Sequence, residues 1–327
     1  MVEADAGGRT TDARATVLPS VTMAICSRNR PGLVQDAVTS VLSGAALPAE
    51  LLIIDQSDVA NEHLRQLRHR RVDIRYLHSS TRGLSTSRNV AVANARNETI
   101  VFTDDDVLVT PAWLGTIVAA LRDAGPRAVV TGRVLAGDPE HGDAFAPSLH
   151  PSTVRRVYEG RIEKDPLATF NFAMTRAAHR NAGGFDSRLG PGTTYPAAED
   201  NDFGYRLLEA GWKIVFEPEA VVYHRAWRRG DDYVALGYSY GRGQGAFYAK
   251  HLALSDPYML RRGGRMLFDH ARRLPKAAVC KHQTRLMREL AWIAGFLSGM
   301  LEWLVTRRRL RATRQPQDLA AKATYET

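Results

Sequence analysis

Cysteine is scarce in this sequence, and the long apolar runs that export or anchor a protein are missing. The 327 residues include two cysteines, Cys26 and Cys280, far apart in the chain. This spacing excludes a disulfide framework and a cysteine-rich zinc site. Residues 1–20 have no apolar segment like that of a secretory signal. We therefore expect a disordered lead over 1–20 and a cytoplasmic protein, with the cytoplasmic face of the membrane as the alternative location.

The composition is otherwise that of an ordinary globular protein. Hydrophobic residues make up 44% of the chain and charged residues 24%, and no internal repeat is present. These proportions exclude collagen-like, low-complexity and wholly disordered proteins. A chain of this length forms one large domain or two small ones.

The net charge of +9 comes from one part of the chain. Residues 261–314 contain fourteen Lys or Arg and three acids, a net charge of +11, which leaves −2 for the rest. Aromatic residues are not interleaved with the basic ones, as a stacking platform for nucleic acid requires. We therefore expect no nucleic-acid partner, and we treat the basic character as a property of the C-terminal segment.

Short apolar runs alternate with helical patterns over residues 21–230. The runs predict strands, and the clearest of them are 21–26, 51–55, 73–78, 99–103, 128–134 and 169–174. Alternating strands and helices favour right-handed crossovers and a mostly parallel sheet. The predicted fold is α/β, with a mostly parallel central sheet flanked by helices over 21–230. A helical, basic extension over 231–314 and a tail over 315–327 follow it.

Acidic residues stand at the predicted ends of strands, where ligands bind in open α/β sheets. Asp55 ends the second strand, and residues 104–106, three consecutive aspartates, end the fourth. Adjacent carboxylates repel one another unless a cation compensates them, and a divalent ion shared with phosphate oxygens is one solution. A solvated turn that caps the helix after Pro111 is the alternative, and for an isolated run of aspartates it is the commoner one.

A second acidic cluster, residues 199–202, follows a Gly- and Pro-rich loop over 183–198. Acids in the first turn of a helix complement its dipole, so capping is the alternative to a catalytic role here. His224 closes an apolar strand, where a lone histidine is more often packed than ligating. None of these features identifies a function by itself.

Taken together and in order, these segments resemble a known family. The motifs are VTMAICSRNRP, LLIIDQS, RGLSTSRNVAVANA, IVFTDDDV, GGFDSRLG, EDNDFGYRLLEAGW and VVYH, all between residues 21 and 224. They resemble family-two glycosyltransferases with the A-type (GT-A) fold. The resemblance implies an enzyme that moves a sugar from a nucleotide diphosphate sugar to an acceptor hydroxyl.

The resemblance also implies roles for individual residues. The nucleotide-sugar site is expected to include Ser27, Arg28, Asp55, Arg82, Gly83, Arg88, Asn89, Asp104 and Asp105. Within this set, Asp55 matches the residue that bonds the base, and Asp104 the residue that binds the ribose. Asp55 is followed by Gln56-Ser57, where many relatives have Asp-Gly-Ser. The base therefore stays open, with UDP as the first choice and dTDP and GDP as alternatives.

For the chemistry, the resemblance implies a divalent metal ion and one catalytic base. Asp106 and His224 match the ligands of Mn²⁺ or Mg²⁺, and Asp200 matches the base, with Glu199 and Asp202 beside it. A metal ion would stabilise charge that grows on the leaving diphosphate. A single base with in-line attack gives inversion, and we expect the neighbouring acids to raise the pKa of Asp200.

The C-terminal third leaves several interpretations open. Residues 241–246 match the letters G-x-G-x-x-A, but no strand precedes them, which argues against a dinucleotide site. Residues 290–305 are apolar with one charge, yet a spanning helix needs about 20 such residues. We expect segment 261–314 to pack on the catalytic domain, to form a homodimer or to make a peripheral membrane contact.

Two other classes of protein share parts of this pattern. A sugar nucleotidylyltransferase would carry a Gly-rich loop after the first strand, where this chain has CSRNR. A non-catalytic nucleotide-sugar-binding protein or membrane scaffold with the same fold stays the alternative. For a transferase, the acceptor is a lipid-linked glycan, a polysaccharide or a natural product.

Overall fold

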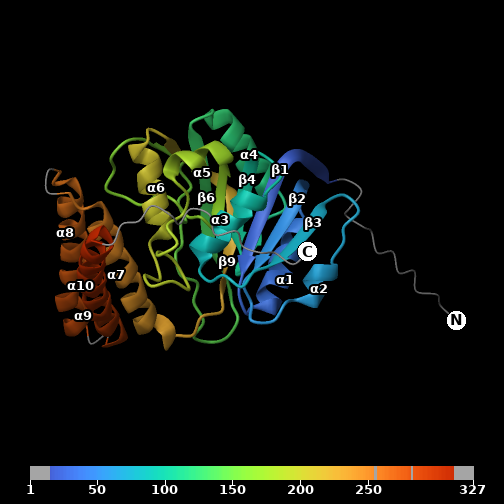
Figure 1. Cartoon of the computed structure of the whole chain (residues 1–327). Coiled ribbons are helices and arrows are strands. Elements are labelled where there is room, and N and C mark those ends of the chain that lie inside the picture. The colour runs from blue at the N-terminus through green and yellow to red at the C-terminus, as the bar shows by residue number, and fades with distance from the viewer. Residues whose placement is uncertain (1–14, 254–255, 281–282, 313–327) are drawn as a thin grey trace.

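The computed structural model describes residues 15–253, 256–280 and 283–312 (Figure 1). A central mixed sheet is covered by helices on both faces, and a group of four helices packs at one side of this domain. The tail predicted over 315–327 and residues 1–14 of the predicted lead lie outside the described residues.

Nine strands form the sheet in the order β3-β2-β1-β4-β8-β6-β9-β5, and β7 pairs with β9. Their bounds are β1 Thr16–Ser27, β2 Ala46–Asp55, β3 Asp73–His78, β4 Thr99–Asp104, β5 Val107–Val109, β6 Ala128–Pro139, β7 Arg156–Tyr158, β8 Asn171–Thr175 and β9 Lys213–Ala226. Strands β1 to β4 are mutually parallel, and Ser27 pairs with Asp55 while Cys26 pairs with Asp104. The predicted strand-end residues therefore meet at one edge of the sheet.

Six helices of the domain divide between the two faces. They are α1 Pro31–Leu42, α2 Glu62–Gln66, α3 Leu84–Asn94, α4 Trp113–Ala124, α5 Arg176–Ala182 and α6 Glu199–Glu209. Alternating residues of β1 enter the two cores, with Ile25 packed among side chains of α1, α2 and α4 and Ala24 among those of α3, α5 and α6. This alternation follows from the two-residue period of a strand.

The predicted α/β class and the mostly parallel sheet are confirmed, and some details are corrected. β1 begins at Thr16, so residues 16–20 belong to the sheet rather than to a disordered lead. β8 runs antiparallel to both β4 and β6. β9 is a strand of 14 residues that ends just after His224, and the short elements β5 and α5 were not predicted.

The C-terminal extension consists of α7 Asp232–His251, α8 Tyr258–Ala271, α9 Leu274–Val279 and α10 Gln283–Ala312. A Cβ atom on Gly241 of α7 would lie 2.0 Å from the carbonyl oxygen of Trp292, and one on Gly299 of α10 would lie 2.0 Å from that of Arg242. The backbones of α7 and α10 are therefore in direct contact. The G-x-G-x-x-A letters lie inside α7, which confirms that they are not a dinucleotide loop.

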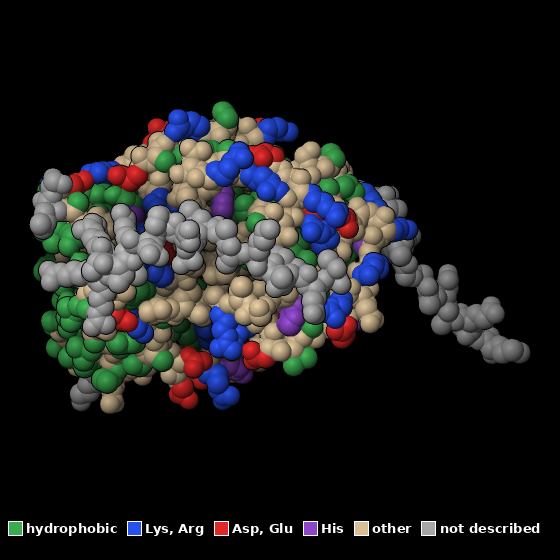
Figure 2. All heavy atoms as spheres, in the orientation of Figure 1, with side chains coloured by type: hydrophobic (Ala, Val, Ile, Leu, Met, Phe, Trp, Pro, Cys, Tyr) green, Lys and Arg blue, Asp and Glu red, His purple; other side chains and the backbone are tan. Residues whose placement is uncertain are grey.

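The outer side of the extension carries exposed apolar side chains. We call the following set the apolar face: Leu260, Phe268, Val279, Met287, Leu290, Leu297, Leu301 and Val305. Figure 2 shows hydrophobic side chains gathered over the extension at the left of the view. None of the helices in residues 15–253, 256–280 and 283–312 is long and apolar enough to cross a membrane.

Candidate active site

A cleft of about 610 Å³ opens at the carboxyl edge of β1, β2 and β4. Three parts of the chain line it: the strand ends, the loop that leads into α6, and helices of the extension. Ten of the predicted site residues lie in its wall: Ser27, Arg28, Gly83, Arg88, Asp104, Asp105, Asp106, Glu199, Asp200 and His224. The fold thus brings together residues that are far apart in the sequence.

Asp104 is held by the most buried cation of the cleft. Arg88, with 1% of its side chain exposed, places Nη2 at 3.0 Å from Oδ1 of Asp104 and Nη1 at 3.5 Å from Oε1 of Glu199. Burial opposes ionisation of the arginine, but the surrounding carboxylates outweigh it and raise the pKa of Arg88. Arg88 is therefore a permanent positive charge between the strand-end acids and α6.

Asp105 turns back towards β1. Its carboxylate accepts hydrogen bonds from Oγ of Ser27 at 2.8 Å and from Nη1 of Arg30 at 2.9 Å. Burial raises the pKa of Asp105 to about 7, against the opposing charge of Arg30. The loop after β1 is tied to the aspartate run by these two bonds.

Asp106 faces β9 and the residues that follow it. Its Oδ1 lies 3.5 Å from Nε2 of His224, and its Oδ2 accepts a hydrogen bond from Nε1 of Trp227 at 3.1 Å. Arg30 and Arg228 lie on the ring of Trp227, with guanidinium carbons 5.0 and 4.7 Å from its centroid. Although burial opposes it, His224 holds the pKa of Asp106 below its ordinary value.

Arginines therefore compensate the aspartate run. Arg88 pairs with Asp104, and Arg30 lies 2.9 Å from Asp105 and 3.6 Å from Asp106. The repulsion that we expected to require a metal ion is offset by these protein cations. The sequence could have indicated this, because two arginines flank Asn29 immediately after β1.

The two residues predicted to bind a metal ion lie next to each other. Across the described ranges, no group of three His, Cys, Asp or Glu side chains is arranged to hold a metal ion. Asp106 and His224 nevertheless face each other in the cleft wall, and Nδ1 of His224 is buried without a hydrogen-bond partner. A divalent ion bound by one or two protein ligands and completed by diphosphate oxygens needs no third side chain.

Glu199 and Asp200 begin α6 after a strained residue. Ala198, the N-cap, is a buried non-glycine residue with φ of 69°, a left-handed conformation that costs energy. Asp200 accepts a hydrogen bond from Oγ1 of Thr169 at 3.1 Å. Burial and the charge of Asp200 raise the pKa of Glu199 well above its ordinary value.

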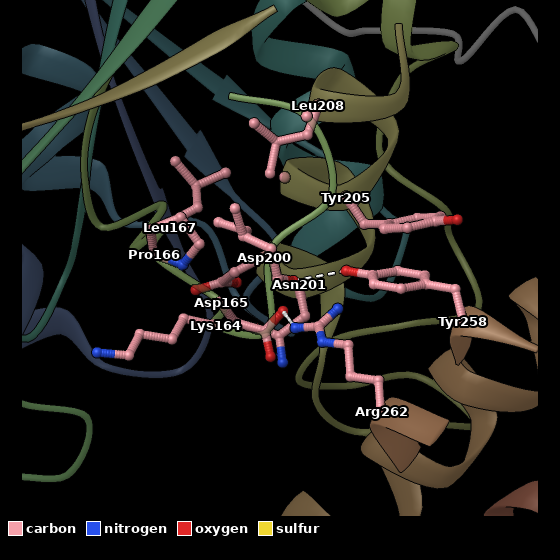
Figure 3. Close-up of a pocket in the computed structure, with 13 residues that line it drawn as sticks. Lys164, Asp165, Pro166, Leu167, Asp200, Asn201, Tyr205, Leu208, Tyr258 and Arg262 are labelled. Carbon is pink, nitrogen blue, oxygen red and sulfur yellow. Dashed lines mark hydrogen bonds and ion pairs between the residues drawn. The ribbon is translucent and has the colours of Figure 1, made fainter. Parts of the chain in front are cut away.

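Asp200 also borders a second, much smaller pocket on the other side of α6 (Figure 3). There Nη2 of Arg262 lies 2.5 Å from Oδ1 of Asp165, and the hydroxyl of Tyr258 donates to the carbonyl of Ile162 at 2.6 Å. This pocket holds only about 10 Å³. It is a packed contact between the domain and the extension.

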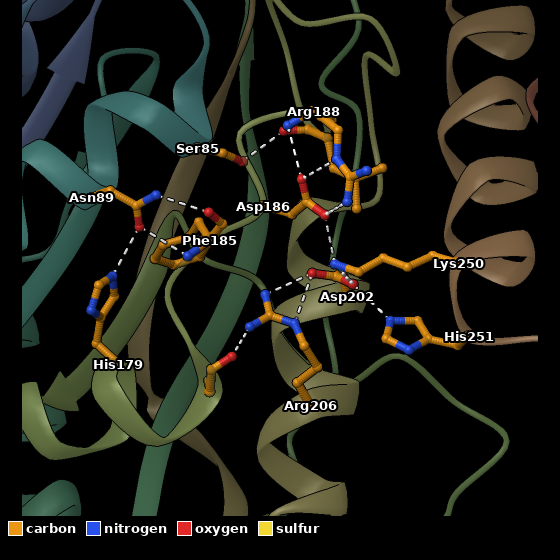
Figure 4. Close-up of polar contacts among 12 residues, drawn as sticks. Ser85, Asn89, His179, Phe185, Asp186, Arg188, Asp202, Arg206, Lys250 and His251 are labelled. Carbon is orange, nitrogen blue, oxygen red and sulfur yellow. Dashed lines mark hydrogen bonds and ion pairs between the residues drawn. The ribbon is translucent and has the colours of Figure 1, made fainter. Parts of the chain in front are cut away.

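Asp202, predicted to stand beside Asp200, lies outside the cleft wall. It is fully buried, and its carboxylate lies 2.6 Å from Nη2 of Arg206 and 2.7 Å from both Nζ of Lys250 and Nε2 of His251 (Figure 4). Burial opposes ionisation, but the bond from His251 and the nearby cations lower the pKa of Asp202 to about 2. Its charge is neutralised by α7, so it joins the extension to α6.

Three more predicted residues are not in the cleft wall. Asp55 is 3% exposed, and its carboxylate accepts hydrogen bonds from the backbone N–H of Ser57 at 2.9 Å and from the hydroxyl of Tyr76 at 2.5 Å. Asn89 bonds backbone groups of Phe185 and the ring of His179 (Figure 4). Arg82 has 68% of its side chain exposed, 3.8 Å from Asp58. The hydrogen bonds of Asp55 and Asn89 hold neighbouring loops in place.

Sequence reasoning missed the part of the cleft that the extension contributes. Five residues from α7, α8 and α10 line the cleft: Tyr240, Gln244, Met266, His270 and Trp292. Gly243 fits α7 against the loop before α6, because a Cβ there would lie 2.5 Å from the carbonyl oxygen of Ala197. The signal in the sequence was weak, since these residues are spread over three helices.

Residues 22–182 match the sequence model of the glycosyl transferase family 2. The pre-mycofactocin glycosyltransferase of Mycobacterium tuberculosis is 26% identical over 261 residues, covering 75% of this chain and 51% of that protein. The succinoglycan biosynthesis protein ExoM of Rhizobium meliloti is 28% identical over 215 residues. The match covers 62% of this chain and 66% of that protein. This chain thus spans about half of the first relative's length and just under two thirds of the second's.

A solved structure has the same fold. The mannosyltransferase PcManGT from Pyrobaculum calidifontis, in complex with GDP-Man and Mn²⁺, superposes with a TM-score of 0.56 at 17% identity, covering 87% of this chain and 88% of that one. By sequence, residues 22–182 of this chain are similar to the glycosyl transferase family 2, and by structure its fold is the GT-A fold of PcManGT.

Proposed function

We propose that this protein is an inverting, metal-dependent glycosyltransferase that uses a nucleotide diphosphate sugar. One observation carries the proposal: the aspartate run at the end of β4 and the Glu199–Asp200 pair line the same cleft, joined by Arg88. The two carboxylate groups serve the two ends of a displacement, the leaving group and the attacking hydroxyl. The family match and the relatives named as glycosyltransferases support this assignment.

The donor would lie along the edge of β1, α3 and β4. Gly83, at the N-terminus of α3, has φ of 99°, and a Cβ there would lie 2.7 Å from Cγ2 of Thr193. Gly83 and Leu84 line the cleft, so the N-terminus of α3 lies in its wall, where backbone N–H groups favour a diphosphate. Asp104 would bond the ribose, and Arg88 would hold that carboxylate in position.

Asp106 and His224 would hold a divalent ion, which supplies Lewis-acid stabilisation of the leaving diphosphate. PcManGT was solved with Mn²⁺, which favours Mn²⁺ over Mg²⁺ as the first ion to test. PcManGT was solved with GDP-Man, and the sequence favours UDP. GDP and UDP are therefore the first nucleotides to test for binding, followed by dTDP.

Asp200 would act as the base. Its carboxylate is oriented by Thr169 and reaches the cleft, where it can take the proton of an acceptor hydroxyl as that oxygen attacks the anomeric carbon. A single base and in-line attack give an inverted product. Glu199, with its raised pKa, stays protonated over a wider pH range than an ordinary glutamate.

Calorimetric titration with UDP, GDP and dTDP, with and without Mn²⁺, tests the donor site. We expect one nucleotide to bind in a metal-dependent manner, and we expect Asp106→Asn to weaken it by at least tenfold. Asp200→Asn should bind the nucleotide normally and lose turnover. If Asp200→Asn keeps full turnover, the base is wrong. If nucleotide binds without any turnover in wild type, the non-catalytic alternative holds.

We also propose that the apolar face rests on an anionic bilayer. Exposed basic side chains lie on α8 and just after it. Arg265, Arg272 and Arg273 pair with Glu163, Asp269 and Glu289, and they can also contact anionic head groups. A second copy of this chain is the other possible occupant of the face. The protein would then act at the cytoplasmic side of a membrane, as the sequence suggested.

A further inference from the structure

The wall that the extension contributes to the cleft consists of two helix faces. Tyr240 and Gln244 are one turn apart on α7, and Met266 and His270 are one turn apart on α8, so each pair lies on one face. Both faces open into the cleft that contains Asp200. The extension is therefore part of the site rather than an attachment to it.

Two polar groups of this wall lack a full set of hydrogen-bond partners. Oε1 of Gln244 is buried and accepts no hydrogen bond from the described residues, which is unfavourable unless a bound group supplies a donor. His270 places Nδ1 at 2.6 Å from Oε2 of Glu289, a residue that is 2% exposed. This bond fixes the ring and leaves Nε2 for another partner.

Of the remaining wall residues, Met266 is apolar and the ring of Trp292 stacks on its neighbours. It lies 3.6 Å from the ring of His270 at 5° and 5.3 Å from that of Phe296 at 26°. These contacts leave less of the Trp292 ring for a sugar, and Tyr240 is the other aromatic side chain that the extension contributes. Met266 adds a flexible apolar side chain.

The chemistry of the wall selects one kind of acceptor. From the described part of the extension, no Lys, Arg, Asp or Glu side chain lines the cleft. A charged acceptor would therefore find no ion-pair partner on the extension itself. An uncharged molecule with a compact apolar body would bury that body against Met266 and Trp292 and bond Gln244 and His270.

We infer that α7, α8 and α10 form an acceptor subsite for an uncharged apolar alcohol, with Gln244 and His270 as its polar contacts. The inference rests on the proposed glycosyl transfer. In that transfer the alcohol oxygen bonds to the anomeric carbon as the bond from that carbon to the diphosphate oxygen breaks. The alcohol proton passes to Asp200, and the nucleoside diphosphate leaves.

The test uses 2-naphthol, a flat apolar alcohol whose fluorescence reports binding, and cellobiose as a sugar competitor. Full-length protein loaded with nucleotide and Mn²⁺ is titrated with 2-naphthol in wild type, Gln244→Met and Met266→Asp. Phe268→Gln is the matched control, because Phe268 lies on α8 with 66% exposure and does not line the cleft. Nucleotide affinity is measured by calorimetry in every variant.

We expect wild type and Phe268→Gln to bind 2-naphthol equally and cellobiose not to compete. Gln244→Met should weaken 2-naphthol by about three- to tenfold through the lost hydrogen bond, and Met266→Asp by at least tenfold. With turnover, both changes should raise KM and leave kcat nearly unchanged.

Unaltered 2-naphthol affinity in both cleft variants, competition by cellobiose, or no binding of 2-naphthol to nucleotide-loaded wild type would overturn the subsite. Failure of every nucleotide to bind wild type would instead count against the proposed function. The two failures are thus read from different titrations of the same samples.

Discussion

Arg88 is a buried cation that pairs with Asp104, with Nη2 of the arginine 3.0 Å from Oδ1 of the aspartate. The other end of the same guanidinium lies 3.5 Å from Glu199 at the start of α6. One side chain therefore couples the end of β4 to the helix that carries the proposed base. The coupling has consequences for stability that can be measured separately from activity.

Replacing Arg88 by methionine should destabilise the protein strongly. The change removes the cation that pairs with the carboxylate of Asp104, and loss of one partner costs about 3–5 kcal/mol in buried pairs. Chemical denaturation followed by circular dichroism gives the free energy of unfolding. Arg82→Met is the control, because Arg82 is 68% exposed and should change stability by no more than about 0.5 kcal/mol. A loss below about 1 kcal/mol in Arg88→Met would contradict the coupling.

Glu199 should make the protein less stable as pH rises. Its pKa is raised in the folded state, so between the unfolded value, about 4.3, and the folded value the native state holds more protons than the unfolded state. Stability therefore falls across that window as pH increases. Glu199→Gln removes this dependence, and denaturation curves from pH 4 upward should be flatter in the variant than in wild type. Parallel slopes would show that Glu199 does not titrate as proposed.

The contact between α7 and α10 predicts opposite effects for two glycine substitutions. Gly241→Ala would place a Cβ 2.0 Å from the carbonyl oxygen of Trp292 and should cost about 1–3 kcal/mol through overpacking. Gly264→Ala, on α8, meets nothing within 4 Å, and it should stabilise the helix by up to about 1 kcal/mol. Thermal unfolding of both variants checks the pair. Equal melting temperatures would mean that the two helices are not in backbone contact.

The apolar face predicts binding to anionic vesicles. Wild-type protein should sediment with phosphatidylglycerol vesicles and much less with phosphatidylcholine vesicles, and added salt should weaken the binding. Leu297→Glu with Leu301→Glu should abolish it, because both side chains are exposed on α10. Nucleotide affinity should be unchanged. A wild-type protein that ignores vesicles but sediments as a dimer, which the double variant dissociates, would show that a second copy covers the face.

Strand-end chemistry was the part of the site that the sequence could predict. The carboxyl ends of β1, β2 and β4 meet because parallel strands in register place their ends together, and the acids at Asp104 and Asp106 follow directly. The helical start at Glu199 was predictable from the loop before it. Both inferences depend only on residues that are close together in the chain, so the local sequence pattern is enough to predict them.

The parts that could not be predicted depend on distant contacts. Asp202 has the sequence context of a helix cap, but its partners Lys250 and His251 lie almost fifty residues further on. Nothing local to β8 reveals that it runs antiparallel between β4 and β6. The role of Gln244 depends on where α7 packs, which its own composition does not encode.

The two sides of α7 are subject to opposite constraints. Towards α10, a Cβ atom added to Gly237, Gly241 or Gly245 would lie less than 3 Å from atoms of that helix, so this side admits no larger residue. Towards the cleft, Tyr240 and Gln244 stand among side chains that can be exchanged. A set of variants mutated only at those cleft positions would therefore change the preference for the acceptor. The packing of α7 against α10 would stay unchanged.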